Sequence, residues 1–226
     1  SEVCVLADAT ADATVVAADL MAQAEHDPLA TCYLVTCDAS FAEKVQGRFA
    51  ELLAASPRAE ITSASLTDQG VVVVAADLEA AIDAVNVIAP EHLELHCDNA
   101  MGLLGKIENA GAIFVGPWSS EPLGDYVAGP NHTLPTGGTA TFSNPLSVQD
   151  FITRSSVICY TPEGLMNDAP ATQTMAQAEG LWAHALSAGL RRKMVEEGLE
   201  GFDGVDLGDI NRIAWPVDLA APKKAE

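Results

Sequence analysis

Histidines at the ends of expected helices and strands are the first sign of chemistry in this sequence. Three of the five histidines, His26, His92 and His132, occupy such positions. His132 lies in the segment 124–136, Gly-Asp-Tyr-Val-Ala-Gly-Pro-Asn-His-Thr-Leu-Pro-Thr, which also holds Asp125 and follows an apolar run typical of a strand. A loop at the carboxyl end of a strand is where open α/β sheets hold their ligands. The pattern therefore predicts that imidazoles and a carboxylate share one rim, as a metal site or an acid/base site.

Gln23 and His26 supply a candidate pair of metal ligands. They are three residues apart at the end of a predicted helix, so their side chains share one face of that helix. Zinc takes nitrogen and oxygen ligands in about fourfold coordination, and a catalytic site keeps a position for substrate. Asp125 and one distant histidine would complete such a set. No His-x-x-x-His cluster anchors this set. Glutamine is also an uncommon zinc ligand, so the alternative is that Gln23 is an ordinary residue of the helix surface.

Glu91 and His92 form a different kind of pair. Adjacent residues at a strand end point in divergent directions, so two separate tasks are expected of them rather than one dyad. An imidazole with a pKa near neutrality can take a proton from an alcohol, and a carboxylate can activate a water. The alternative is a solvated glutamate beside a histidine in a turn.

Several common catalytic motifs are absent from the sequence. No Gly-x-Gly-x-x-Gly follows a strand, and Gly137-Gly138 is not a dinucleotide fingerprint. No serine stands in a nucleophile elbow. If this chain belongs to a dehydrogenase, the segment that binds NAD is expected to lie mostly elsewhere.

The composition excludes some classes of partner. A formal net charge of −21 repels phosphate backbones and anionic lipid headgroups, so neither nucleic acid nor membrane is expected as a partner. The acidity fits adaptation to high salt and simple solubility equally. Five cysteines, an odd number with three in apolar runs, predict free thiols in a reducing cytoplasm.

Helices and strands alternate along most of the chain. The expected fold is therefore α/β: an incomplete Rossmann-like, mostly parallel sheet with helices on both faces, followed by a helical carboxyl-terminal tail. The sheet domain is expected over 1–160 and the tail over 161–226, with a frayed end from Pro216. Strands are expected at 3–6, 31–35, 59–63 (a short edge strand), 70–75 (buried), 85–88, 112–115 and 157–160. Helices are expected at 12–25, 39–55, 78–84, 99–107, from Val148 after a capping box with Asp150, from Pro162, and over 169–197.

Three motifs, in this order, resemble the histidinol dehydrogenase family. They are Gln-Ala-Glu-His at 23–26, Asn-Val-Ile-Ala-Pro-Glu-His-Leu-Glu at 86–94, and the segment 124–136. The likeness runs from Ser1 to the region of Glu179 and His184. It implies a zinc- and NAD-dependent enzyme of histidine biosynthesis that oxidises L-histidinol to L-histidine through an enzyme-held aldehyde, with two NAD molecules reduced.

The resemblance also implies roles for single residues. The positions matching Gln23, His26, Asp125 and His184 bind the zinc, which orients the substrate and is no redox centre. His92 takes the alcohol proton, and Glu91 activates the water that hydrates the aldehyde. The substrate is expected to meet the zinc-binding residues, His92 and three further positions: Ser1, His132 and Glu179.

The family forms a homodimer in which the helical tail reaches the other subunit, so Glu179 and His184 are expected to complete the partner's site. The two lie five residues apart, about 140° round an ideal helix, and Gly180 between them marks a break or a helix start.

Members of the family are about twice as long as this chain. The segment preceding Ser1 in them is expected to carry most of the NAD contacts, so the cofactor-binding residues are unknown here. The chain alone is therefore expected not to turn over. Two alternatives stay open: a non-catalytic α/β metal-binding or dimerisation module, and a zinc hydrolase that uses Glu91 as its base.

Overall fold

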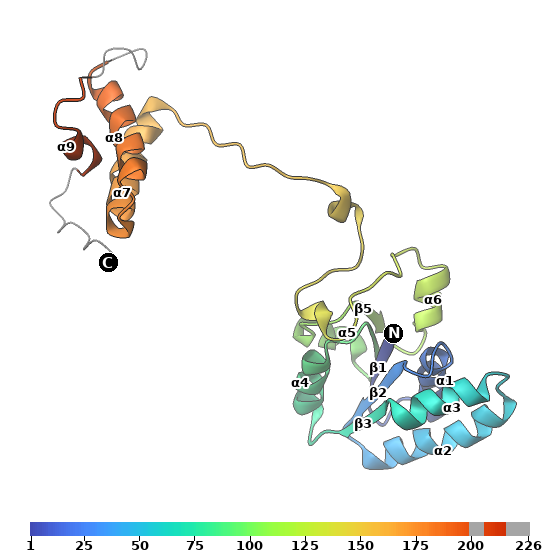
Figure 1. Cartoon of the computed structure of the whole chain (residues 1–226). Helices are drawn as coiled ribbons and strands as arrows, with labels where there is room; N and C mark the ends of the chain where they lie inside the picture. The colour runs from blue at the N-terminus through green and yellow to red at the C-terminus, as the bar shows by residue number, and fades with distance from the viewer. Residues whose placement is uncertain (199–205, 216–226) are drawn as a thin grey trace, which may run out of the picture. The chain divides into compact units, whose positions relative to one another are not determined.

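The computed structural model describes residues 1–198 and 206–215. It divides into two compact units, 1–153 and 154–226, and each is described by itself (Figure 1). The sequence placed a boundary at 160. The roles expected for the two parts, a catalytic rim and an exchanged tail, stay predictions. The frayed end expected from Pro216 lies outside the described residues.

A five-stranded sheet organises the first unit, and all of its pairings are parallel. The order is β3-β2-β1-β4-β5, so the chain builds outward from β1 in one direction and then crosses to its other side. This is the strand order of a doubly wound nucleotide-binding fold with one strand fewer. The strands are β1 (Glu2–Ala7), β2 (Thr31–Thr36), β3 (Gly70–Val74), β4 (His92–His96) and β5 (Ala112–Val115).

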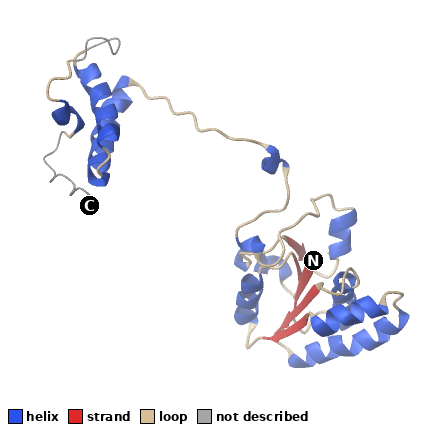
Figure 2. Cartoon of the chain, viewed as in Figure 1, coloured by secondary structure: helices blue, strands red, loops and turns tan. Residues whose placement is uncertain are grey.

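Helices cover both faces of this sheet, as the alternation predicts (Figure 2). One core lies beneath α1 (Ala13–Ala24), α2 (Ala39–Ala55) and α3 (Ala59–Asp68), and the other lies beneath α4 (Leu78–Ile88) and α5 (Ala100–Leu103). Aspartates 12, 38 and 77 cap α1, α2 and α4 by accepting hydrogen bonds from first-turn amides. The remaining short elements of this unit are η1 (Leu104–Lys106), α6 (Glu121–Tyr126), η2 (Thr139–Thr141) and η3 (Val148–Phe151).

Three expected strands are wrong. Residues 59–63 begin helix α3, whose buried Thr62 and Ser65 lie one helical turn apart against the sheet. Residues 85–88 continue α4, where Val85 is buried, so tertiary packing outweighs the β-branched composition of both segments. Residues 157–160 have no regular structure and are exposed. In addition, β3 is a largely exposed edge strand and not a buried one.

The second unit is helical. It contains α7 (Pro162–Glu179), α8 (Trp182–Glu196) and α9 (Ile210–Ala214). Gly180 takes a left-handed conformation, with φ of 75°, between α7 and α8, so the long helix expected over 169–197 is broken there. Glu179 ends α7 and His184 lies in α8. Among the described residues, no helix has both the length and the apolar character to span a bilayer.

Candidate functional site

The register of β4 against β1 determines which of its side chains share a face. His92, Glu94 and His96 pair with Val3, Val5 and Ala7, which belong to the core beneath α1. Leu93 and Leu95 point to the opposite core. All five residues of β4 are buried, so the strand turns two imidazoles and a carboxylate inward beneath helices. We call this the polar face of β4.

Helices α1 and α6 cover the polar face of β4 and add further polar side chains. Asp19 and Gln23 lie one turn apart on α1, and Glu121 and Asp125 lie one turn apart on α6. The two helices contact each other. The result is two clusters of potential ligand atoms, each within 4.8 Å of one another: His92 with Glu121 and Asp125, and Asp19 with Glu94 and His96.

His92 is oriented by a backbone carbonyl. Its Nδ1 lies 3.1 Å from the Glu2 carbonyl oxygen, which can only accept, so Nδ1 carries the proton of the neutral ring. Nε2 is then the basic nitrogen. It lies 3.8 Å from Asp125 Oδ1 and is buried without a hydrogen-bond partner in the described part of the chain. The geometry leaves Nε2 free to accept a proton or bind a metal.

Glu2 and Glu91 hold each other across β1 and the start of β4. The Glu2 amide donates to Glu91 Oε2 at 3.1 Å, and the Glu91 amide donates to Glu2 Oε1 at 3.3 Å. Glu2 Oε1 also accepts from the Gly137 amide at 2.8 Å. Glu2 therefore links Glu91 and His92 to the loop that follows the motif 124–136.

Burial dominates the electrostatics of the two clusters. Loss of solvent, and then the charges of neighbouring carboxylates beginning with Asp125, raise the pKa of Glu121 to about 8. Loss of solvent and the charge of Glu94 raise the pKa of Asp19 to about 7, against an opposing effect of His96. Without a cation, both carboxyls therefore hold protons far above the pH at which exposed carboxyls lose them.

Gln23 provides the test of whether a metal fits. Its side chain is fully buried, and neither the amide oxygen nor the amide nitrogen has a hydrogen-bond partner among the described residues. An unsatisfied buried amide is costly, and a bound ligand would remove that cost. Helix α6, which contacts α1, carries Asp125 in a cluster with His92, and the Asp125 carboxylate and His92 Nε2 are oxygen and nitrogen donors of the kind that zinc accepts. The residues therefore fit a divalent cation.

The structure changes the expected placement of several site residues. His92 opens a strand instead of closing one, and Glu2 opens the neighbouring strand, so this part of the site lies at the amino ends of the strands. Asp125 lies in helix α6 and not in a loop, because residues 121–126 turn back over β5. The expected rim at the carboxyl ends is therefore wrong for Glu91 and His92.

The remaining predicted residues are exposed. Ser1 precedes β1 and accepts a hydrogen bond from the Thr31 amide through its carbonyl. His26 lies in the turn after α1, and its amide donates to the Gln23 carbonyl. His132 lies in the loop after α6. Glu179 and His184 are exposed on the second unit, and their roles stay predictions.

Four buried polar residues of the site, Glu2, Glu94, His96 and Glu121, and the half-buried Asp19 are absent from the sequence-based set. The sequence did contain a signal for Glu94 and His96, because His-Leu-Glu-Leu-His at 92–96 alternates polar and apolar residues as a strand does. That alternation predicts a solvated polar face, and only the cover by α1 and α6 shows it to be internal.

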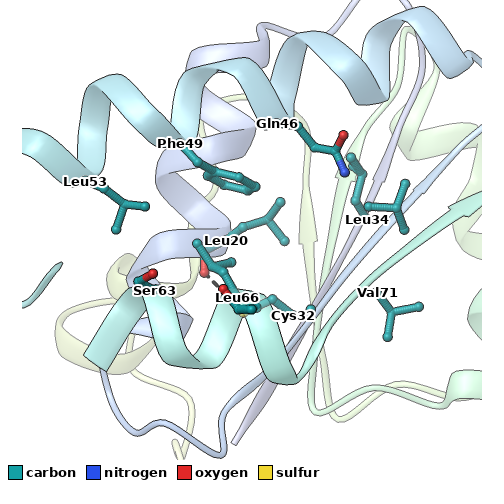
Figure 3. Close-up of a pocket in the computed structure, with 12 residues that line it drawn as sticks. Leu20, Cys32, Leu34, Gln46, Phe49, Leu53, Ser63, Leu66 and Val71 are labelled. Carbon is teal, nitrogen blue, oxygen red and sulfur yellow. Dashed lines mark hydrogen bonds between the residues drawn. The ribbon is translucent and has the colours of Figure 1, made fainter. Parts of the chain in front are cut away.

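Two pockets of the first unit differ in character. The pocket in Figure 3, of about 270 Å³, lies where Phe49 and Leu53 of α2 face Leu66 of α3, and no carboxylate or imidazole is among its described lining residues. A groove of about 690 Å³ runs along β5 and α6, and Asp125 is on its wall beside apolar residues such as Trp118 and Leu134. The groove has the mixture of apolar walls and few polar groups that is typical of small-molecule sites.

The fold and the buried site define a parallel α/β protein with the histidine and carboxylate arrangement typical of enzymes that bind a metal or transfer protons. A family profile described as histidinol dehydrogenase matches residues 1–192. The chain belongs to the histidinol dehydrogenase family.

Individual relatives agree with this assignment. The histidinol dehydrogenase of Moorella thermoacetica is 52% identical over 193 residues, which cover 85% of this chain and 46% of that protein. That of Halalkalibacterium halodurans is 49% identical over 191 residues, covering 84% of this chain and 45% of that protein. The crystal structure of histidinol dehydrogenase from Elizabethkingia anophelis superposes with a TM-score of 0.80 at 38% identity, covering 87% of this chain and 45% of that one. The chain spans less than half the length of these relatives.

Proposed function

We propose that this chain is the metal- and acid/base-bearing part of a zinc-requiring, NAD-dependent histidinol dehydrogenase. The whole enzyme would oxidise L-histidinol to L-histidine through the aldehyde. The observation that carries the proposal is the orientation of His92, whose Nδ1 is held by the Glu2 carbonyl while Nε2 faces Asp125 without a hydrogen bond. Family membership supplies the substrate class.

The acid/base steps follow from the two held side chains. Oxidation of an alcohol removes a hydride from carbon and a proton from the hydroxyl, and Nε2 of His92 is the basic atom that would take that proton. The aldehyde must add water before the second hydride leaves. Glu91, fixed at Oε2 by the Glu2 amide, is the carboxylate that would take a proton from that water. The two tasks fall to different residues because adjacent side chains of an extended segment diverge.

Zinc would be held by Gln23, His26, Asp125 and His184, the last from the tail of a second subunit. When bound, the metal would fix and polarise the substrate's nitrogen and oxygen groups. The unsatisfied Gln23 amide and the carboxylate of Asp125 support this assignment. Ser1, His132 and Glu179 would contact the substrate together with His92 and the metal ligands.

NAD and the dimer complete the proposal. The nicotinamide cofactor would bind mostly through the half of the relatives' length that this chain does not cover, because the sequence lacks a dinucleotide fingerprint. Exchange of the helical tail within a homodimer would place His184 and Glu179 in the partner's site. A cytoplasmic location fits a biosynthetic enzyme with free cysteines.

A chimera tests the proposal. This chain would replace the aligned carboxyl-terminal region of the Moorella thermoacetica relative, and NADH formation from histidinol would be measured with zinc present. Turnover is expected in the chimera, no turnover is expected from the 226-residue chain alone, and His92→Gln should lower the chimera's rate by a factor of about 10² to 10⁴. Asp83→Asn, an exposed change on the other face of the sheet, is the control.

The coverage of the relatives favours one alternative, a non-catalytic metal-binding or dimerisation module. A folded chimera that binds zinc and forms no NADH would establish it. A zinc hydrolase would instead act on its substrate without NAD. Consumption of the substrate, measured with and without the nucleotide, therefore distinguishes the hydrolase from the dehydrogenase.

A further inference from the structure

The cluster of Asp19, Glu94 and His96 forms a second site that shares no residue with the zinc set proposed above. We propose that it binds a divalent cation of the zinc type. The site lies on the polar face of β4 at the end that holds His96, the last residue of the strand. It draws on α1 for Asp19 and on β4 for the other two residues.

The distances within the cluster are those of ligands round a shared ion. His96 Nε2 lies 3.3 Å from Glu94 Oε2 and 3.4 Å from Asp19 Oδ2. Tetrahedral ligands about 2.0 to 2.1 Å from zinc are about 3.3 to 3.4 Å from one another. Charge-assisted hydrogen bonds are shorter, about 2.7 to 2.9 Å. With both carboxyls ionised, none of the three facing atoms makes a hydrogen bond among the described residues, although all three are buried.

The charge of the cluster also calls for a cation. Two carboxylates face one imidazole, which carries at most one positive charge. The Glu94 side chain is fully buried and that of His96 is 3% exposed. An excess negative charge at such a position is costly unless a cation or a proton neutralises it. A divalent ion would neutralise both carboxylates at once.

A backbone hydrogen bond orients the Glu94 carboxylate toward the cluster. Glu94 Oε1 accepts from the Glu121 amide at 2.8 Å, which leaves Oε2 directed at His96. Outer contacts of this kind orient metal ligands. The Asp19 side chain is 12% exposed, although its Oδ2 atom is buried. Zinc held by these three protein ligands would have a fourth position for water.

Imidazole nitrogen spectra of the metal-free chain provide the test. The five histidines would be resolved in a ¹⁵N-labelled sample, His96 assigned with His96→Gln, and zinc chloride added stepwise. A saturable shift of the His96 Nε2 resonance is expected. In Asp19→Asn its apparent affinity should fall by about tenfold or more, whereas Asp83→Asn should leave it unchanged.

The same titration separates this site from the family zinc set. In Asp125→Asn the His96 response should persist even if the resonances of His26 and His184 no longer respond. A His96 resonance that stays in place through two equivalents of zinc in the wild-type chain would overturn the proposal. The zinc response is read on the wild-type chain, and the His96 ring can also be assigned through its bonds to the His96 backbone resonances, so the test does not depend on a variant that folds.

Discussion

His92 Nε2 and Asp125 Oδ1 face each other at 3.8 Å, one from the first residue of β4 and the other from the end of α6. The separation exceeds that of a hydrogen bond, and both atoms belong to a cluster of potential ligand atoms. An ion or a substrate atom between them would contact both. The position of α6 above β5 therefore determines whether the two groups can act together.

Gly124 is expected to control that position. A Cβ at residue 124 would lie 2.5 Å from Phe114 Cε1, and the Phe114 ring in turn lies 6.1 Å from the His92 ring between centroids. Gly124→Ala should displace α6 or the ring and weaken zinc binding several-fold. The gain in helix propensity should keep the change in unfolding free energy within about 1 kcal/mol. Zinc affinity would be measured against a chelator.

Gly105→Ala is the control for this change, because nothing lies within 4 Å of a Cβ there. Equal zinc affinities for Gly124→Ala and the wild-type chain would show that α6 does not position Asp125 for the metal.

Gly111 allows its own backbone to approach those of Glu91 and Pro135 closely. A Cβ there would lie 2.5 Å from the Glu91 carbonyl oxygen and 3.2 Å from that of Pro135. Backbone cannot yield as a flexible side chain does, so Gly111→Ala should lower the free energy of unfolding by about 2 to 3 kcal/mol. Urea denaturation followed by circular dichroism measures this loss.

Gly47→Ala is the matched comparison. Gly47 lies within α2 with nothing within 4 Å of a Cβ, so the substitution should stabilise the chain by about 0.5 to 1 kcal/mol. Similar effects of the two alanines would contradict the close approach at Gly111.

Much of the fold was predictable because local patterns and tertiary packing agree there. The helix 39–55 and the strand 112–115 have the expected bounds, the capping box of Ser147 and Asp150 is present, and Gly180 breaks the tail helix. The end of α4 was not predictable. Ala89 takes a left-handed conformation with φ of 49°, which glycine normally supplies, so the sequence holds no stop signal before Pro90.

Site residues could be predicted from the sequence only where they belong to a recognisable motif. Asp125 and His92 were selected from the sequence, and the structure brings them together. Glu121 was missed because a glutamate beside Pro122 resembles any exposed helix start, and its burial depends on the contact of α6 with the polar face of β4. The zinc, substrate and acid/base roles of the selected residues stay predictions.

Protonation of Glu121 should make the stability of the metal-free chain depend on pH. Its pKa rises from 4.5 when unfolded to about 8 in the folded chain, so the folded state holds more protons between these values. The contribution of Glu121 to the free energy of unfolding is then fully present below about pH 4.5 and is lost as the pH rises toward 8. Asp19, with a pKa of about 7, acts in the same direction.

Urea titrations in EDTA between pH 5 and pH 8, at spacings of about half a unit, would measure this slope. Glu121→Gln keeps the shape of the neutral carboxyl and should reduce this slope, leaving the part that Asp19 contributes. Asp8, Asp12 and Asp38 have lowered pKa values and act only below their ordinary value of 3.8, outside the window. A free energy of unfolding that rises with pH in both the wild-type chain and Glu121→Gln would show that Glu121 is ionised in the folded chain.

Salt should stabilise the chain. A net charge of −21 repels itself in the compact state, and added ions screen that repulsion. The urea midpoint should rise steeply at first and then level off, since the screening length falls from about 30 Å at 0.01 M to about 3 Å at 1 M sodium chloride. A rise that continues undiminished at molar salt would instead indicate adaptation to a saline environment.

The inward face of β4 keeps this sheet less stable than its topology allows. Valine or leucine in place of Glu94 and His96 would match the aliphatic layer that Val5 and Ala7 already form, without the desolvation of charge. These substitutions in β4 should raise the melting temperature of the chain, and they would remove the carboxylate and imidazole atoms that could bind a metal ion in its interior. Selection for thermal stability alone would therefore favour aliphatic residues at these positions, at the loss of an imidazole and a carboxylate that can bind ions or protons.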